Sequence, residues 1–292
     1  MTLWLGKKME FRGPCRLSCR MAGSGPPLLL VHGVGNTSSM AEMIPLFDAM
    51  LTRRTVVALD LPGFGASERS DRDYTPRLMT DALHLTAAFL RVQCKLPPRH
   101  RLDAVAYGLS CEFLARAAVE DPVRWGRLTF ISPTGLNGPG PRDHAWVNRL
   151  RNAVMRRLLK TQLWGRAVYG GLTSPLVVRR ELQSTFGSVY VDDELFDNAL
   201  AATRDPGARF APFRALTGQL ASPDIETVYQ RVRQPVWVTH GKRGIAAEFR
   251  HNPKLQSKPN WRLTAFKSGA MPHFQHNPAF VHVLEKFLAE DL

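Results

Sequence analysis

Cysteine is scarce in this sequence, with four residues among 292, and their positions match no metal-binding spacing. They are Cys15, Cys19, Cys94 and Cys111. Such isolated cysteines are typical of reduced thiols in a cytoplasmic protein. The chain also contains no apolar run near the roughly 20 residues that a membrane-spanning helix needs. We therefore expect a cytoplasmic protein with no disulfide framework, no metal site and no cofactor.

A secretory signal is also missing, because the first twenty residues contain neither a continuous apolar segment nor a small-residue cleavage site. They are rich in Lys and Arg and contain one acid, Glu10, which loosely resembles a transit peptide. Apolar residues alternate with polar ones at Met9, Phe11, Leu17 and Met21, as they do in strands. We favour a first pair of strands that belongs to the fold.

Negative charge is in short supply: 39 Lys and Arg stand against 25 Asp and Glu, giving a net charge of +14 and a pI of about 10.2. A field of this sign attracts anions of every class, including acidic lipid and phosphorylated or carboxylated ligands. No zinc finger, RNA-recognition or other nucleic-acid module is present in the sequence. We therefore expect no specific nucleic-acid binding.

Short apolar runs alternate with longer helical patterns, which indicates an α/β fold. It is a mostly parallel twisted sheet with helices on both faces. The predicted strands are Pro27–His32, Thr55–Asp60, Leu102–Ala106, Leu128–Ser132, Pro235–His240 and Trp261–Phe266. The predicted helices include Leu78–Val92, Cys111–Val119 and Phe280–Ala289. Because residues 135–232 contain no convincing buried strand, we predict a helical cap there, inserted into a core domain of residues 1–134 and 233–292.

Two motifs carry a family resemblance. His32-Gly33 closes the apolar run PLLLV, and VVALDLPGFGAS at Val56–Ser67 has the form Asp-x-Pro-Gly-x-Gly-x-Ser. At this separation, before a strand–turn–helix, they resemble the α/β-hydrolase superfamily (AB hydrolase-1 type). The resemblance covers essentially the whole chain and is least specific in the cap. It implies the α/β-hydrolase fold and a Ser-His-Asp site.

The nucleophile elbow of that family, strand then Gly-x-Ser-x-Gly then helix, has two possible registers here. In one, Gly108 holds the nucleophile position between Ala106 and Ser110. In the other, Ser110 is the nucleophile, between Gly108 and Glu112. We favour the first, because the sharp turn needs small neighbours and Glu112 would crowd it. Gly also removes the strain of positive φ at this position.

The other two triad positions also differ from the family pattern. The segment that would contain the catalytic histidine reads Gly-Ala-Met-Pro-His, which places Ala270 at the histidine's position and His273 at a second, structural one. The loop that would contain the acid has Gly244 and Ile245 after two cations. We therefore predict a member of the family with no functional triad, a pseudoenzyme for serine hydrolysis, with no catalytic residues at these positions.

The resemblance leaves an oxyanion hole in place, because its donors are the backbone amides of Val34 and Leu109. The candidate ligand-binding positions surround it: His32, Val34, Tyr107, Gly108, Leu109, Ser110, Ala270 and His273. Of these, His32 and His273 are usually structural, and Tyr107 is more often a packing residue than a proton donor.

The predicted cap is basic, with nine Lys or Arg and one acid between Arg142 and Arg180. A solvated helix face is the simplest interpretation, and contact with an acidic membrane or an anionic carrier is the alternative. We favour a non-hydrolytic protein that binds a small molecule under this cap, apolar with an anionic or carbonyl group. The alternatives are an enzyme with non-triad chemistry (lyase, isomerase or cyclase), through Tyr107, His273 or Lys242, and a weak esterase using Ser110.

Overall fold

An eight-stranded sheet forms the centre of the computed structural model, which describes residues 6–136, 162–243 and 258–290. The strand order is β1-β2-β4-β3-β5-β6-β7-β8. The strands are β1 (Lys7–Arg12), β2 (Arg16–Gly23), β3 (Pro27–Val31), β4 (Thr55–Asp60), β5 (Leu102–Tyr107), β6 (Trp125–Ile131), β7 (Val236–Gly241) and β8 (Trp261–Phe266). The first two run antiparallel to their neighbours, and all later pairs are parallel. The predicted fold class is confirmed.

Burial along the strands explains their positions in the sheet. All five residues of β3 and all seven of β6 are buried, as expected for central strands covered on both faces. Strand β1 alternates between exposed and half-buried residues, as expected at an edge. Its Phe11 stacks on Phe89 with ring centroids 4.3 Å apart, so the N-terminal hairpin is part of the fold.

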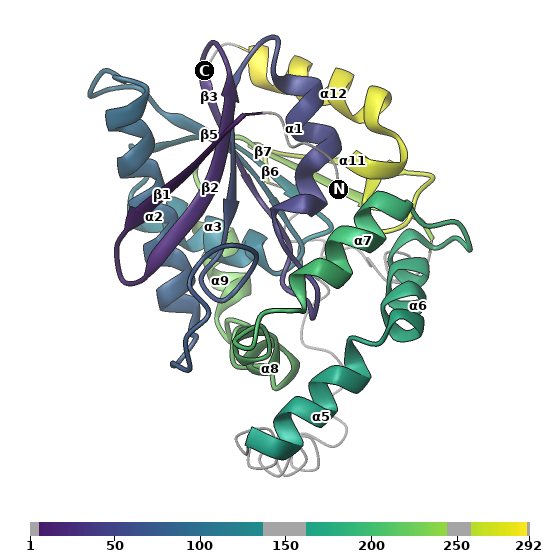
Figure 1. Ribbon diagram of the computed structural model, residues 1–292. Helices are drawn as coiled ribbons and strands as arrows, with labels where there is room; N and C mark the ends of the chain where they lie inside the picture. Colours follow the sequence, from purple (N-terminus) through teal and green to yellow (C-terminus); the bar gives the residue numbers. More distant parts are fainter. Residues whose placement is uncertain (1–5, 137–161, 244–257, 291–292) are drawn as a thin grey trace.

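Helices cover both faces of the sheet (Figure 1). One face packs against α2 (Pro76–Gln93), α3 (Ser110–Glu120) and α9 (Ile225–Arg231). The other packs against the 3-10 turn η1 (Met40–Met43), α1 (Ile44–Met50) and α12 (Asn277–Ala289). Helix α2 begins where Thr75 accepts a hydrogen bond from the Leu78 amide and Pro76 occupies the first turn. The predicted start at Leu78 is therefore two residues late.

The predicted strands are all present, with small changes at their ends. Strand β6 begins at Trp125, three residues before the predicted start, because Leu102 pairs with Trp125 across a register shift. Strand β5 continues through Tyr107, which pairs with Ile131. The predicted strand ends at His32 and Ser132 lie one residue beyond the observed ends of β3 and β6.

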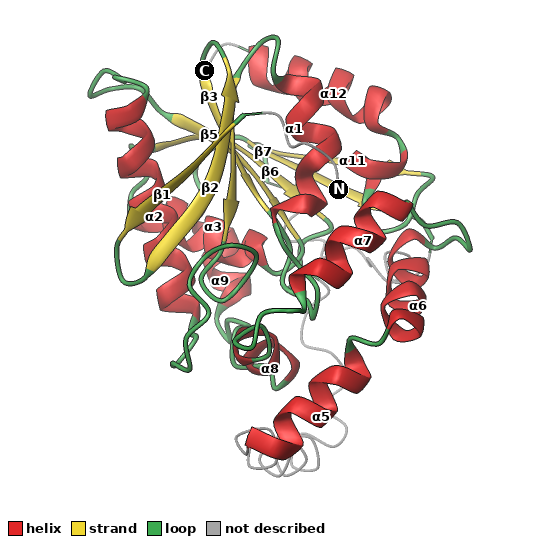
Figure 2. Ribbon diagram, viewed as in Figure 1, coloured by secondary structure: helices red, strands yellow, loops and turns green. Residues whose placement is uncertain are grey.

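Between β6 and β7 the described residues form helices and loops, as Figure 2 shows. The helices in this segment are α5 (Gln162–Leu172), α6 (Pro175–Phe186), α7 (Asp193–Ala202), α8 (Phe210–Leu216) and α9. Ile225, Val228 and Tyr229 of α9 pack in the same cluster as β6, so this last helix lies against the sheet rather than apart from it. None of the described helices is long and apolar enough to cross a bilayer.

Candidate functional site

A cavity of about 790 Å³ lies at the carboxyl ends of the parallel strands. Its wall is formed by the loops that follow β3, β5, β6 and β8, the end of β7, and parts of α6, α7 and α8. Open α/β sheets bind their ligands at this edge. Most of the cap-side wall is apolar, through Leu182, Leu195, Leu216 and Ile225, whereas the strand-side wall contains most of the polar groups.

Gly108 forms the turn between β5 and α3. Its φ is +60°, and its amide donates a hydrogen bond to the Ile131 carbonyl at 2.9 Å. A Cβ added to Gly108 would meet nothing within 4 Å, and Gly108 lines the cavity. The turn thus has the positive φ of a nucleophile elbow and open space where a side chain would project.

Ser110 lies two residues further on, at the start of α3, and does not line the cavity. Its side chain is fully buried, and its hydroxyl donates a hydrogen bond to the His32 carbonyl at 2.5 Å. The neighbouring Cys111 is also buried, and burial raises the pKa of its thiol well above the ordinary value. Because neither side chain lines the cavity, the structure does not place Ser110 as a ligand-binding or nucleophilic group.

Val34 and Leu109 both line the cavity, one on the loop after β3 and the other at the start of α3. Within the described residues, neither backbone amide donates to a protein acceptor. Both residues are half-buried, so two amides without a protein acceptor beside a cavity are available to water or to a ligand oxygen. The structure places both predicted oxyanion residues in the lining of the cavity that Gly108 also lines.

Ala270 lines the same cavity, and its backbone is fixed on both sides. Its amide donates to the Thr185 carbonyl at 2.7 Å, and its carbonyl accepts from Ser132 Oγ at 2.7 Å. Ser132 directly follows β6 and has a φ of +44°. The loop that follows β8 is thereby held against both the sheet and α6, with a methyl side chain at the position where the resemblance places a histidine.

His273 lies behind the cavity wall rather than in it, which corrects the expectation that it contacts a ligand. The ring is fully buried, and Nε2 donates to the Glu42 carbonyl at 2.9 Å. Burial lowers the pKa of His273 to about 4, so the ring is neutral. Within the described part of the chain, Nδ1 has no hydrogen-bond partner. His273 positions the backbone of η1.

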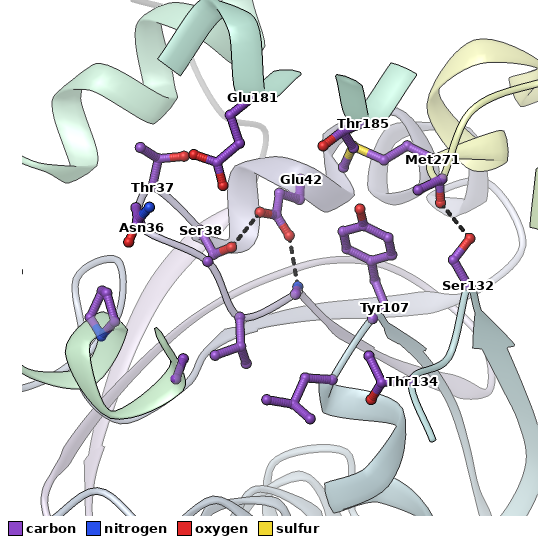
Figure 3. A pocket seen from close by; sticks show the side chains of 18 of the residues that line it. Asn36, Thr37, Ser38, Glu42, Tyr107, Ser132, Thr134, Glu181, Thr185 and Met271 are labelled. Atoms are coloured by element: carbon purple, nitrogen blue, oxygen red, sulfur yellow. Dashed lines mark hydrogen bonds between the residues drawn. The ribbon is translucent and has the colours of Figure 1, made fainter. Parts of the chain in front are cut away.

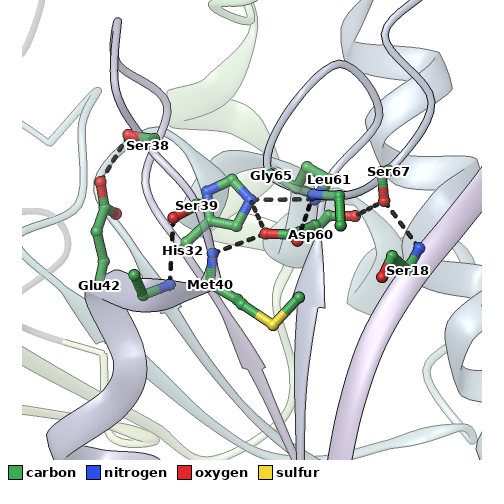
Figure 4. Close-up of polar contacts among 12 residues, drawn as sticks. Ser18, His32, Ser38, Ser39, Met40, Glu42, Asp60, Leu61, Gly65 and Ser67 are labelled. Atoms are coloured by element: carbon green, nitrogen blue, oxygen red, sulfur yellow. Dashed lines mark hydrogen bonds and ion pairs between the residues drawn. The ribbon is translucent and has the colours of Figure 1, made fainter. Parts of the chain in front are cut away.

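His32 is also enclosed, which corrects its place among the ligand-binding candidates. Its Nδ1 donates to the Gly33 carbonyl at 2.5 Å and its Nε2 accepts from the Leu61 amide at 3.0 Å. Asp60 beside it accepts from the amides of Met40 and Ala66, at 2.7 and 2.8 Å (Figure 4). Burial lowers the pKa of His32 to about 4 and raises that of Asp60 to about 6. These contacts tie together the loops after β3 and β4.

Glu42 is a cavity residue that the sequence did not reveal. Its Oε2 accepts from the Gly33 amide at 2.7 Å, and its Oε1 accepts from the Ser38 hydroxyl at 2.7 Å (Figure 3). Burial raises the pKa of Glu42 to about 7, with the charge of Glu181 adding to the rise. In the sequence, Ser39 and Glu42 have the spacing of a capping box. That pattern predicts a helix start and would not have drawn attention to a cavity carboxyl.

Tyr107 and Glu181 border the same part of the wall. A Cβ placed on Gly33 would lie 2.8 Å from the Tyr107 ring and 3.0 Å from Glu42 Oε2, so both side chains meet at this glycine. Burial raises the pKa of Glu181, whose carboxyl faces Asn36 and Ser38 (Figure 3). The Tyr107 hydroxyl has no hydrogen-bond partner within the described residues.

The described lining contains three carboxyl side chains, Glu42, Glu112 and Glu181, and neither Lys nor Arg. Glu112 is enclosed, since it accepts from the Thr134 hydroxyl at 2.5 Å and from the Ser222 amide at 2.8 Å. In this described part of the wall, a ligand anion would lie beside carboxyl groups with no Lys or Arg to pair with, which is unfavourable for a buried charge.

Several predicted features lie elsewhere. Gly244 and Ile245, the predicted acid position, are outside the described residues, as are six of the nine basic cap residues. Lys242 is exposed and does not line the cavity. Contact of the basic cap with an acidic membrane or carrier stays a prediction.

In the ranges that the structure describes, no group of three or more His, Cys, Asp or Glu could hold a metal ion.

Comparison with known proteins identifies relatives in sequence and in structure. The alpha/beta hydrolase family profile matches residues 28–283. The chain is 28% identical to a 2-hydroxymuconate semialdehyde hydrolase of Pseudomonas putida, covering 92% of this chain and 89% of the relative. It is 25% identical to an uncharacterised Mycobacterium tuberculosis protein, covering 94% and 78%. A meta-cleavage product hydrolase of Pseudomonas fluorescens superimposes with a TM-score of 0.70 at 18% identity, covering 98% of each chain. The chain belongs to the alpha/beta hydrolase family.

Proposed function

We propose that this protein is a non-hydrolytic alpha/beta hydrolase that binds an apolar molecule through its carbonyl oxygen. The observation that carries the proposal is the turn at Gly108. It keeps the positive φ of the elbow, faces the cavity and has no side chain with which to attack a carbonyl carbon. Val34 and Leu109 line the same cavity, and their amides have no protein acceptor among the described residues.

The general base is missing by the same reasoning. Ala270 stands where the family resemblance places the catalytic histidine, and an alanine side chain cannot accept a proton. The nearby His273 has its Nε2 committed to the Glu42 carbonyl and lies behind the wall. In another triad enzyme, loss of the nucleophile or the histidine lowers turnover by about 10⁶-fold. The proposal therefore predicts binding without measurable ester hydrolysis.

The ligand class follows from the wall. Apolar side chains from α6, α7, α8 and α9 cover most of the cap side, which suits a hydrocarbon skeleton. The available donors are backbone amides, which suit a carbonyl oxygen. The described wall offers no Lys or Arg to a carboxylate or phosphate.

Binding of 2-tetralone and of tetralin, the same skeleton without the oxygen, tests the proposal directly. Two hydrogen bonds to the ketone, each worth about 0.5–1.5 kcal/mol, predict a Kd for 2-tetralone that is lower by at least about fivefold. Isothermal titration measures both. Equal affinity for the two compounds, or no binding of either, would contradict a carbonyl site.

Native mass spectrometry of the purified protein gives a second test, and we expect a retained neutral small molecule. Hydrolysis of p-nitrophenyl butyrate should not exceed the buffer rate, and a fluorophosphonate probe should leave Ser110 unlabelled. Labelled Ser110 together with ester turnover would replace the proposal with the weak-esterase alternative.

A further inference from the structure

Glu42 has a carboxyl that the proposed binding role leaves unused. Both of its oxygens are oriented, one by the Gly33 amide and one by the Ser38 hydroxyl. Gly33 directly precedes Val34, so the carboxyl lies one residue from an amide that the proposed function assigns to the ligand oxygen. The carboxyl also lines the cavity. A carbonyl compound held by the Val34 amide therefore has the Glu42 carboxyl beside it.

Tyr107 supplies a second polar group at the same place. Its ring packs against Gly33, and its hydroxyl has no hydrogen-bond partner in the part of the chain that the structure describes. Figure 3 shows this hydroxyl directed between Glu42 and Met271. Burial raises the pKa of Tyr107 above its ordinary value, so the hydroxyl keeps its proton and acts as a donor.

The groups that face Glu42 come from four elements. Glu181 on α6 and Asp60 at the end of β4 are acids, and both raise the pKa of Glu42. Tyr107 on β5 is uncharged, and His273 on α11 (Pro272–Gln275) is neutral. Burial is the largest cause, and the hydrogen bonds from Ser38 and Gly33 act in the opposite direction, leaving a pKa of about 7. Glu42 can thus gain or lose a proton near neutral pH.

We propose that Glu42 is a general base that removes a proton from the carbon next to a ligand carbonyl, making this site an enolising one. The substrate class is a ketone or aldehyde with an apolar skeleton and an acidic α-hydrogen. The inference rests on the proposed function, because the carbonyl oxygen must be held by the Val34 and Leu109 amides. It requires no serine nucleophile, which suits a turn that has lost its side chain.

The step balances without any co-reactant. The α C–H bond breaks, and its proton forms an O–H bond on the Glu42 carboxylate. The C–H electron pair becomes the carbon–carbon double bond of the enolate, and the carbonyl π pair moves to oxygen. The Val34 and Leu109 amides stabilise that oxygen. Glu42 then returns the proton to the same carbon. In a substrate with a second double bond conjugated to the enolate, Glu42 returns the proton to the far end of that bond instead, which shifts the double bond.

Exchange of the α-hydrogens of 2-tetralone in D₂O, followed by proton NMR, tests the proposal. We expect the wild-type protein to exceed the buffer rate. Glu42→Gln should lower the protein-dependent exchange rate by at least about 10²-fold, because a general base usually contributes that much. The rate should rise with pH and level off above about 7, because the carboxylate is the active form.

Two further variants separate chemistry from structure. Glu42→Asp keeps a carboxyl, so its exchange should be slower yet retain a sigmoidal pH profile even where Glu42→Gln folds poorly. Glu194→Gln, on an exposed glutamate of α7, should match the wild type. A role limited to holding the Gly33 loop would change affinity or stability and would not produce this pH profile.

Binding and hydrogen exchange of 2-tetralone distinguish the base role of Glu42 from the binding role of the cavity. If 2-tetralone binds at least about fivefold better than tetralin but its hydrogens exchange at the buffer rate, the base role is overturned and the binding site stands. If Glu42→Gln exchanges as fast as the wild type, Glu42 is not the base. If 2-tetralone binds no better than tetralin, both proposals fail.

Discussion

The loop after β3 joins two polar regions that differ in how completely their hydrogen bonds are satisfied. One region is the Asp60 network, defined as His32, Asp60, Ser67 and the amides they bind. The other is the Glu42 rim, defined as Glu42, Tyr107, Gly108 and the amides of Val34 and Leu109. In the network both carboxyl oxygens and both His32 nitrogens have protein partners. On the rim, the Tyr107 hydroxyl and two amides have none within the described residues.

The difference indicates what each region does. Groups that satisfy one another hold two loops together and gain nothing from a ligand. Groups that face a cavity without a protein partner can form hydrogen bonds with a ligand. Both regions contain an acid whose pKa burial raises, so the pKa shift alone does not distinguish them. The distinction comes from which partners are present.

Replacing the two acids one at a time should give the largest difference between the two regions. Asp60→Ala leaves a buried Met40 amide and the Ala66 amide without acceptors and should lower the free energy of unfolding by about 3 kcal/mol or more. Glu42→Ala exposes its former donors to the cavity and should cost less, about 1 kcal/mol. Urea unfolding at pH 7 measures both, and equal losses would remove the distinction.

The pH dependence of the free energy of unfolding tests whether Glu42 titrates as its buried position predicts. The folded protein holds the Glu42 proton up to a pKa of about 7, against an ordinary value of 4.5. Between these values the folded state binds more protons than the unfolded state, so stability falls as pH rises through the window. The effect is on the order of 3 kcal/mol.

Glu42→Gln lacks this titration and supplies the control. Because the buried His32 and His273 rings give the opposite slope below their ordinary pKa, the useful quantity is a double difference. The free energy of unfolding should fall more between pH 5 and pH 8 in the wild type than in Glu42→Gln. The same slope in both proteins would show that Glu42 titrates normally.

Two glycines provide a matched pair across the regions. Gly65 in the loop after β4 has a φ of +50°, and Gly108 has a φ of +60°, so alanine suffers similar strain at each, about 1–2 kcal/mol. A Cβ on Gly65 would overlap the Asp60 carboxylate, whereas one on Gly108 meets nothing within 4 Å. Gly65→Ala should therefore cost about 2 kcal/mol more than Gly108→Ala. Equal costs in thermal unfolding would mean that the elbow is not open.

The fold was predictable because its signals are local. Apolar runs bounded by turns predict β3 and β4, and the two family motifs resemble the α/β-hydrolase superfamily and so imply its fold. Strand ends were less accurate, as at Trp125, because pairing with a neighbouring strand extends a strand beyond its apolar run. The position of Gly108 at the strand–helix turn follows from the small residues required around a sharp turn.

The chemistry of the cavity was harder to predict. Glu42 and Glu181 are far apart in the sequence, and only folding brings them to the same wall. The net charge of +14 suggested an anionic ligand, yet the described lining contains carboxyl groups and no cation. Net charge averages over the whole surface, whereas a pocket is made by a few side chains. Motif position suggests His32, Ser110 and His273 as ligand-binding residues, because the buried hydrogen bonds that occupy them are visible only in three dimensions.

Cysteine labelling at positions 108 and 110 tests the central claim most directly, namely that the open elbow position is Gly108 and carries no nucleophile. Gly108→Cys and Ser110→Cys are each treated with N-phenylmaleimide, and peptide mass mapping separates the new thiol from the half-buried Cys94. The account predicts labelling at position 108 at least about tenfold faster than at position 110, because accessible thiols react and buried ones do not. Faster labelling at position 110 would contradict this claim and favour the alternative register, in which Ser110 is the nucleophile.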